Sequence, residues 1–162
     1  MATKIDGETY LGETLVQSIS KSGEVTMYLW PLRCLNNKTG GPTFGVDVKN
    51  VEVIRFDTHG QGGHWHARGY DKLGPGKSHI DFPDGIDAVD QQLEWSLRHI
   101  REETKHLLKD AGYHEEAKSI DTDMLNAATG AINQHLKKEG DLRPQAIAEG
   151  ALSGQQFRII SQ

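Results

Sequence analysis

The spacing of apolar residues changes near residue 84, and this change constrains the fold more than any other feature of the 162-residue chain. Before residue 84, apolar and polar residues tend to alternate, as in strands with one buried face. After it, apolar residues recur at steps of three, four and seven, as in amphipathic helices. The sequence therefore predicts a single α+β domain. Residues 1–83 would be mainly β, residues 84–152 mainly α, and residues 153–162 a short strand or tail.

The first half predicts an antiparallel sheet of about five or six strands. Pro31 cannot donate to a ladder, so its strand should lie at an edge or bulge there. Lys49-Asn50 fits a two-residue hairpin turn, and the Gly-rich segments 59–63 and 72–77 fit short connections. The expected strands cover residues 9–19, 24–35, 44–48, 51–57, 64–70 and 79–82.

The second half predicts a long amphipathic helix that lies across one face of the sheet. Asp84 is a reasonable N-cap for this helix, and Gly112 a reasonable C-terminal stop. A second helix is expected over residues 122–139. Pro144 fits the first turn of a short third helix.

Composition excludes several classes of protein. A single cysteine, Cys34, excludes an internal disulfide framework and is expected to be a buried small hydrophobic residue. No apolar run approaches the roughly 18 residues of a spanning helix, so no membrane association is expected. The N-terminal residues do not resemble a secretory signal, which predicts a cytoplasmic protein. The net charge of −5 disfavours a broad nucleic-acid-coating surface.

Histidines are concentrated between residues 59 and 79, where four of the eight occur. Because successive side chains of a strand point to opposite faces, the strands over 51–57, 64–70 and 79–82 should each have an apolar and a polar side. The apolar side would pack beneath the long helix. The polar side would carry Arg55, Asp57, His64, His66, Arg68, His79 and Asp81.

A divalent metal ion is the first chemistry that this polar face predicts. His64 and His66 share a face, and Asp57, His79, Asp81 or His59 are candidates to complete the coordination sphere. Neutral imidazoles with one or two carboxylates suit Zn²⁺, Mn²⁺ or Fe²⁺. An open coordination position would then permit activation of water.

The second chemistry is metal-free cleavage of a phosphodiester such as RNA. His64 and His66 would act as general base and general acid, while Arg55 and Arg68 hold the phosphate, helped by Lys72 or Lys77. A third interpretation is a non-enzymatic protein with incidental histidines, because a half-exposed sheet alternates in the same way. Its sheet, or the helix that carries Trp95, would then bind a protein partner or a second copy of the chain.

A competing arrangement lies on the long helix, where Glu103 and His106 form a Glu-x-x-His step. Such pairs occur in carboxylate-bridged metal bundles, where the ligands face inward. These residues lie mostly off the stripe of Leu93, Leu97 and Ile100, which favours a solvated, charged helix face.

The strand Val51–Asp57, the Thr58-His59-Gly60 turn, the His64-Trp65-His66 strand and the following long helix resemble the TumE-like group of small bacterial proteins. This group includes toxins of toxin–antitoxin pairs and uncharacterised members. The resemblance covers roughly residues 25–112. It implies an α+β fold and a toxin-like or nuclease-like activity, and it assigns no catalytic residue.

Overall fold

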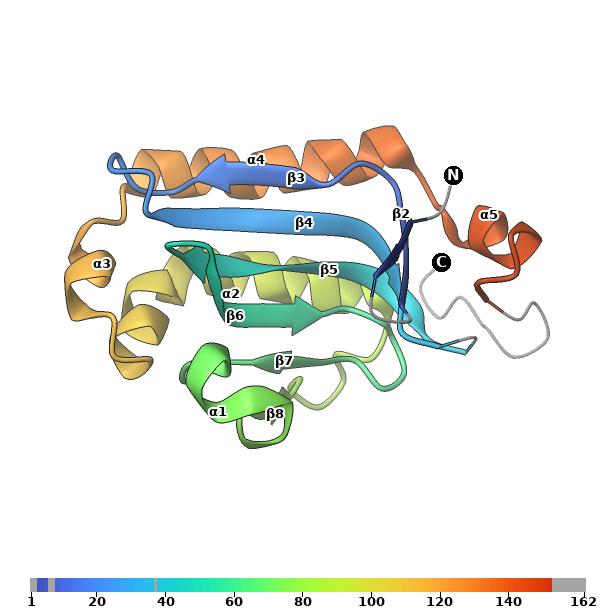
Figure 1. Cartoon of the computed structure of the whole chain (residues 1–162), viewed down its shortest axis with the longest axis horizontal. Helices are drawn as coiled ribbons and strands as arrows, with labels where there is room; N and C mark the ends of the chain where they lie inside the picture. Colours follow the sequence, from blue (N-terminus) through green and yellow to red (C-terminus); the bar gives the residue numbers. More distant parts are fainter. Residues whose placement is uncertain (1–2, 6–7, 37, 153–162) are drawn as a thin grey trace.

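The computed structural model describes residues 3–5, 8–36 and 38–152, and it confirms the α+β fold class. The sheet forms one layer, and the two long helices cover one of its faces (Figure 1). The strands are β1 (Thr3–Ile5), β2 (Glu8–Leu11), β3 (Leu15–Ser18), β4 (Val25–Cys34), β5 (Gly40–Val48), β6 (Val51–Asp57), β7 (His64–His66) and β8 (His79–Asp81). The helices are α1 (Tyr70–Lys77), α2 (Val89–Asp110), α3 (His114–Lys118), α4 (Thr122–Glu139) and α5 (Arg143–Ala148).

The described strands form an eight-stranded sheet in the order β1-β2-β4-β5-β6-β7-β8, with β3 paired to β4. All of these pairs are antiparallel. The count exceeds the expected five or six because β1 is added and the strand expected over residues 9–19 is split. The split follows Leu11, where Gly12 takes a positive φ of 85° and the chain moves from β2 to β3.

Two local predictions for the strands are confirmed. Lys49 and Asn50 both have positive φ, at 50° and 67°, as a two-residue turn between β5 and β6 requires. Pro31 lies where the register of β4 against β5 shifts, between Trp30 and Arg33. Because β4 is paired along both edges, a bulge rather than an edge position accommodates this proline.

The main core lies between the sheet and helices α2 and α4, and both halves of the sequence contribute to it. Phe56 is fully buried and stacks on Phe44 and Trp65, with ring centroids 5.0 and 5.2 Å away. Trp95 of α2 is only partly buried and packs against Phe82 and Trp65. It therefore widens the packed face of α2.

The helical half follows the prediction except at the start of α2. Helix α4 covers the expected residues, and Pro144 lies in the first turn of α5. The N-cap prediction for Asp84 is wrong because α2 begins at Val89. The side chain of Gln92 donates to the carbonyls of residues 86 and 87, which holds that segment as a separate turn. Residues 153–162, expected as a strand or tail, lie outside the described residues.

The short turn expected over residues 72–77 is also wrong, since this segment is helical in α1. Gly74 interrupts the helix with a φ of 76°, just before Pro75. Tertiary contacts hold the segment in place. Lys72 donates to the carbonyl of Ala111, and the Tyr113 hydroxyl donates to Asp71 at 2.6 Å. Among the described residues, no helix combines the length and the apolar character needed to cross a membrane.

Candidate metal centre

The three strands β6, β7 and β8 form the meander that the alternating sequence predicts. Their register places Asp57 opposite His64, Arg55 opposite His66, and His66 opposite His79. Apart from the exposed Val51, the apolar side chains of these strands pack into or against the main core. The polar side chains lie on the other face of the sheet, where the candidate site is.

Arg68 does not belong to this set, and the prediction that it shares the face of His64 and His66 is wrong. Strand β7 ends at His66, and Arg68 has a left-handed φ of 64°, so the alternation does not continue to it. Its exposed guanidinium donates to the carbonyl of Lys77 at 2.7 Å.

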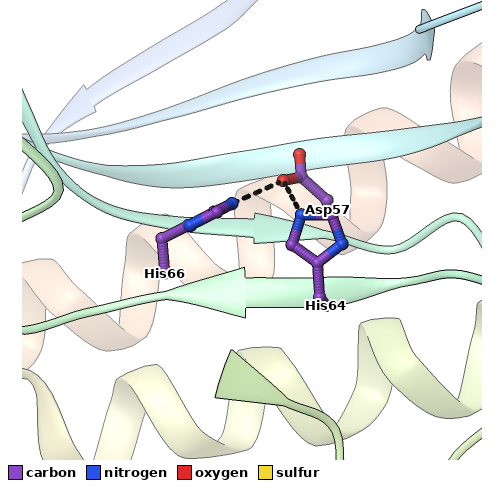
Figure 2. Close-up of side chains that lie close together, drawn as sticks. All are labelled: Asp57, His64 and His66. Atoms are coloured by element: carbon purple, nitrogen blue, oxygen red, sulfur yellow. Dashed lines mark ion pairs between the residues drawn. The ribbon is translucent and has the colours of Figure 1, made fainter. Parts of the chain in front are cut away.

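Asp57, His64 and His66 come together at the centre of the polar face (Figure 2). The Nε2 atoms of His64 and His66 lie 3.3 and 3.4 Å from the same oxygen, Oδ2 of Asp57. One ligand atom from each residue lies within 4.8 Å of the other two, a spacing at which the three could hold one metal ion. The Asp57 side chain is fully buried, His66 is 2% exposed and His64 is 19% exposed.

The other ring nitrogen of each histidine is fixed by a hydrogen bond. Nδ1 of His64 donates to the carbonyl of Gly62 at 3.0 Å. Nδ1 of His66 lies 3.0 Å from Oγ of Ser78, whose hydroxyl donates to the carbonyl of Gly74 and therefore accepts from the imidazole. With the Nδ1 proton in place, a neutral ring directs the lone pair of Nε2 toward Asp57.

This arrangement leaves three electron-rich atoms facing one another. Two imidazole lone pairs and a carboxylate oxygen repel at these distances unless positive charge lies between them. A proton on each ring supplies that charge, and so does a single divalent cation. Accordingly, the contact with Asp57 raises the pKa of His64 above its usual value. Metal-binding histidines are held in the same way, by a hydrogen bond at the nitrogen that does not bind the metal.

The second carboxylate oxygen of Asp57 is held by other donors, of which Nε of Arg55 also lies 3.2 Å from Oδ2. Oδ1 accepts from Nη1 of Arg33 at 2.9 Å, from the Thr43 hydroxyl at 3.2 Å and from Nε of Arg55 at 3.2 Å. Burial raises the pKa of the Asp57 carboxyl. The contacts with His64 and His66 and the charge of Arg55 outweigh burial and hold this pKa well below its usual range. Asp57 is therefore an oriented carboxylate.

Further carboxylates neutralise the two arginines. Arg33 is 5% exposed and forms a two-point ion pair with Glu8, at 2.7 and 2.8 Å. Arg55 contacts Glu52 at 3.3 Å, and its guanidinium lies over the ring of Tyr70, 5.1 Å from the centroid. The sequence predicts a polar face. This network of ion pairs covers the centre of that face, so the side chains there are buried.

His59 is a fourth histidine near Asp57. Its side chain is fully buried, and its Nε2 lies 3.8 Å from Oδ1 of Asp57. Among the described residues, neither ring nitrogen of His59 has a hydrogen-bond partner. Burial lowers the pKa of His59 to about 4, so the ring is neutral near pH 7. It approaches the carboxylate at Oδ1, and its ring centroid lies 6.5 Å from that of His64, so His59 borders the three-residue cluster.

His79 and Asp81, two further predicted ligands, lie beside the cluster and not in it. They pair with each other on β8, with His79 Nε2 2.8 Å from Asp81 Oδ1. The alternative on α2 has the expected solvated character, because His106 is exposed and pairs with Asp110 at 3.3 Å. Cys34 is buried and free, as expected.

Sequence reasoning missed the residues that orient the three candidate ligands. Arg33 and Thr43 lie on β4 and β5, far from the histidines in the sequence, and only the sheet order brings them to Asp57. Ser78 is adjacent to His79 in sequence but contacts His66, because Ala67 donates its N–H to the Ser78 carbonyl across the β7–β8 connection. The cross-strand register is the signal that could have found Ser78.

Fold and site together define an α+β protein with a buried carboxylate–histidine cluster on the sheet face opposite α2 and α4. Residues 22–136 match the family model described as a domain of unknown function, DUF7700, and the chain belongs to this family. The matched region contains the cluster, Arg33 and Ser78. No curated protein and no solved structure matches the chain. The resemblance to the TumE-like group stays a prediction.

Proposed function

We propose that this protein binds one divalent transition-metal ion through Asp57, His64 and His66 and uses it for hydrolysis. A single observation carries the proposal. Two Nε2 atoms converge on one carboxylate oxygen while both Nδ1 atoms are tied to acceptors. A cation between the three atoms would satisfy every group of the cluster.

The ligand types narrow the choice of ion. Mg²⁺ and Ca²⁺ prefer all-oxygen sites, whereas two imidazoles and one carboxylate suit Zn²⁺, Mn²⁺ or Fe²⁺. Three protein ligands are typical of catalytic zinc sites, which keep a further position for water or substrate. A metal-bound water is acidic enough to supply hydroxide near neutral pH, so hydrolysis is the reaction that this ligand count favours.

The metal-dependent reaction has more support than the metal-free one. In a metal-free RNase, Arg55 and Arg68 would hold the phosphate. In the structure, Arg55 is bound by Asp57, Glu52 and Tyr70, and Arg68 points to the carbonyl of Lys77. A phosphodiester such as RNA remains the first substrate class to test, because an ion itself binds and polarises phosphate oxygens.

An open pocket of about 400 Å³ near the chain segment that leads into His64 offers a place for a small substrate. It is lined by the loop of residues 60–63, by Asp81 and by Asp87, among others. None of the three candidate ligands lines this pocket. Its link to the site is the carbonyl of Gly62, which accepts the Nδ1 hydrogen bond of His64.

The test is the metal content of protein purified without a histidine tag, before and after reconstitution with Zn²⁺, Mn²⁺ or Fe²⁺. We expect about one equivalent in the wild type and loss of the ion in the His64→Ala/His66→Ala double variant. The matched control is His106→Ala/His114→Ala, which removes two exposed histidines elsewhere and should retain the ion. Equal metal content in both double variants, or none in reconstituted wild type, contradicts the proposal.

Hydrolysis is tested separately with the loaded protein on RNA and on an activated phosphodiester. The wild type and the His106→Ala/His114→Ala control should turn over substrate, and the His64→Ala/His66→Ala variant should not. If stoichiometric metal is bound and neither substrate is cleaved, the phosphodiester assignment is wrong while the metal site stands.

A further inference from the structure

We propose that His79 and Asp81 form an outer metal site through which the ion passes on its way to the buried cluster. The inference rests on the proposed metal binding by Asp57, His64 and His66. It gives a role to the two predicted ligands that the structure places beside the cluster, on the edge strand β8.

The outer pair has the composition of a weak metal site. Nε2 of His79 and Oδ1 of Asp81 lie 2.8 Å apart and are offered to solvent together, with the Asp81 side chain 90% exposed and that of His79 43% exposed. One imidazole and one carboxylate can capture a hydrated divalent ion. Two ligands do not hold it as tightly as three, so an ion captured there can move on.

One member of the pair, His79, is in direct contact with a ligand of the cluster. The ring of His79 stacks on that of His64, with centroids 4.5 Å apart and planes inclined by 23°. Its centroid is also 6.0 Å from that of His66. The metal-ligating groups therefore form a continuous series from solvent to interior, in the order Asp81, His79, His64 and then Asp57 with His66.

Exposure falls along this series without a break. The side chains are 90% exposed at Asp81, 43% at His79, 19% at His64, and 2% or less at His66 and Asp57. A divalent ion loses its hydration water at high cost, so a path that replaces waters one ligand at a time lowers the barrier to a buried site. An ion that moved directly from solvent to the buried cluster would have to lose its hydration waters without this stepwise replacement.

A similar pair on α2 provides the comparison that separates a transit site from an ordinary surface contact. His106 and Asp110 are also exposed and lie 3.3 Å apart. Among the described residues, no candidate metal ligand of the cluster contacts them. If exposed His–Asp pairs merely attract cations, both pairs should affect metal uptake equally.

The experiment measures the rate of Zn²⁺ uptake by metal-free protein, the rate of release to a chelator, and the equilibrium affinity. In Asp81→Asn and His79→Ala, uptake and release should both slow by about tenfold, the low end of the range by which a charged surface changes association rates. The affinity should be unchanged, because the bound state keeps its three ligands. His106→Ala and Asp87→Asn serve as controls, the latter removing one charge from the same pocket.

Each other outcome overturns the proposal in its own way. Faster uptake in His79→Ala means that the ring only covers the cluster. Unchanged rates, or equal slowing in Asp87→Asn, mean that the pair has no specific part in uptake. A weaker affinity in Asp81→Asn means that Asp81 binds the resting ion. Failure of the wild type to bind Zn²⁺ instead overturns the proposed function.

Discussion

Asp47 and Asp57 lie on the same β5–β6 hairpin, on strands that pair with each other, yet their carboxyl groups have opposite surroundings. Asp57 is contacted by two arginines, a threonine and three histidines, and its pKa is held well below the usual range. Oδ1 of Asp47 is buried without a hydrogen-bond partner, and burial, with the charge of Glu52, raises the pKa of Asp47 to about 6.

The difference shows how a fold tolerates a buried carboxyl group. Asp47 is half-buried and its Oδ1 has no hydrogen-bond partner among the described residues, so the group keeps its proton in mildly acidic solution. At Asp57 several strands supply donors and cations that keep the group charged. A buried charge that is compensated in this way requires many side chains to be fixed, and such fixing is typical of a binding site.

The strongest test of this comparison is Asp57→Asn, which keeps the shape of the side chain and removes its charge. We expect the free energy of unfolding to fall by about 3–5 kcal/mol at pH 7, because Arg33 and Arg55 lose their shared counterion. Since the pKa of Asp57 is lowered by folding, its contribution is present above about pH 4 and is lost as the pH falls below that value. Urea unfolding in the presence of a chelator measures both effects.

The control for this variant is Asp81→Asn, whose carboxylate is exposed and should contribute less than about 0.5 kcal/mol to stability. If the two variants have the same stability, the arginines around Asp57 do not depend on its charge. The difference between the surroundings of Asp47 and Asp57 would then not affect the stability of the protein.

The second test is Asp47→Asn, which should stabilise the protein. Folding raises the pKa of the Asp47 carboxyl group to about 6. The folded state therefore loses stability relative to the unfolded state as the pH rises from about 4 to 6. The amide does not ionise, so the variant should gain about 1–2 kcal/mol over the wild type at pH 8, after allowance for partial exposure. At pH 4 the two proteins should have the same stability. Thermal unfolding at both pH values checks the sign, and equal stability at pH 8 contradicts it.

The smallest expected effect concerns the hydrogen bond behind His66. Ser78→Ala removes the acceptor of Nδ1 and should weaken metal binding by about tenfold. It should lower the free energy of unfolding by about 1 kcal/mol. Titration calorimetry of the metal-free protein measures the affinity, and Ser119→Ala is a control at a serine whose hydroxyl bonds only to the backbone of α3. Unchanged affinity would mean that Ser78 does not orient the ring.

Sequence reasoning predicts those parts of the fold that are determined by residues close together in the sequence. The alternation in β6 and β7 places Phe56 in the core and Asp57 with His64 and His66 on the other face. The positive-φ turn at Lys49-Asn50 follows from the same local rules.

The remainder depends on contacts between distant segments. Helix α1 contains Gly74 and Pro75, both poor helix formers, and is held by contacts with Ala111 and Tyr113. The burial of the polar face depends on Arg33 of β4. Its side chain reaches Asp57 of β6 because a single strand, β5, separates the two. No local pattern around Arg33 predicts that distance.

All three candidate ligands lie between residues 57 and 66, within a single hairpin whose loop spans residues 58–63. Closing so short a loop costs little chain entropy, so the hairpin can bring the ligands together before the distant strands are in place. An ion present during synthesis would therefore meet its ligands early and bias the nascent chain toward the β6–β7 register. In this way the ion would act on the folding route as well as on the finished protein.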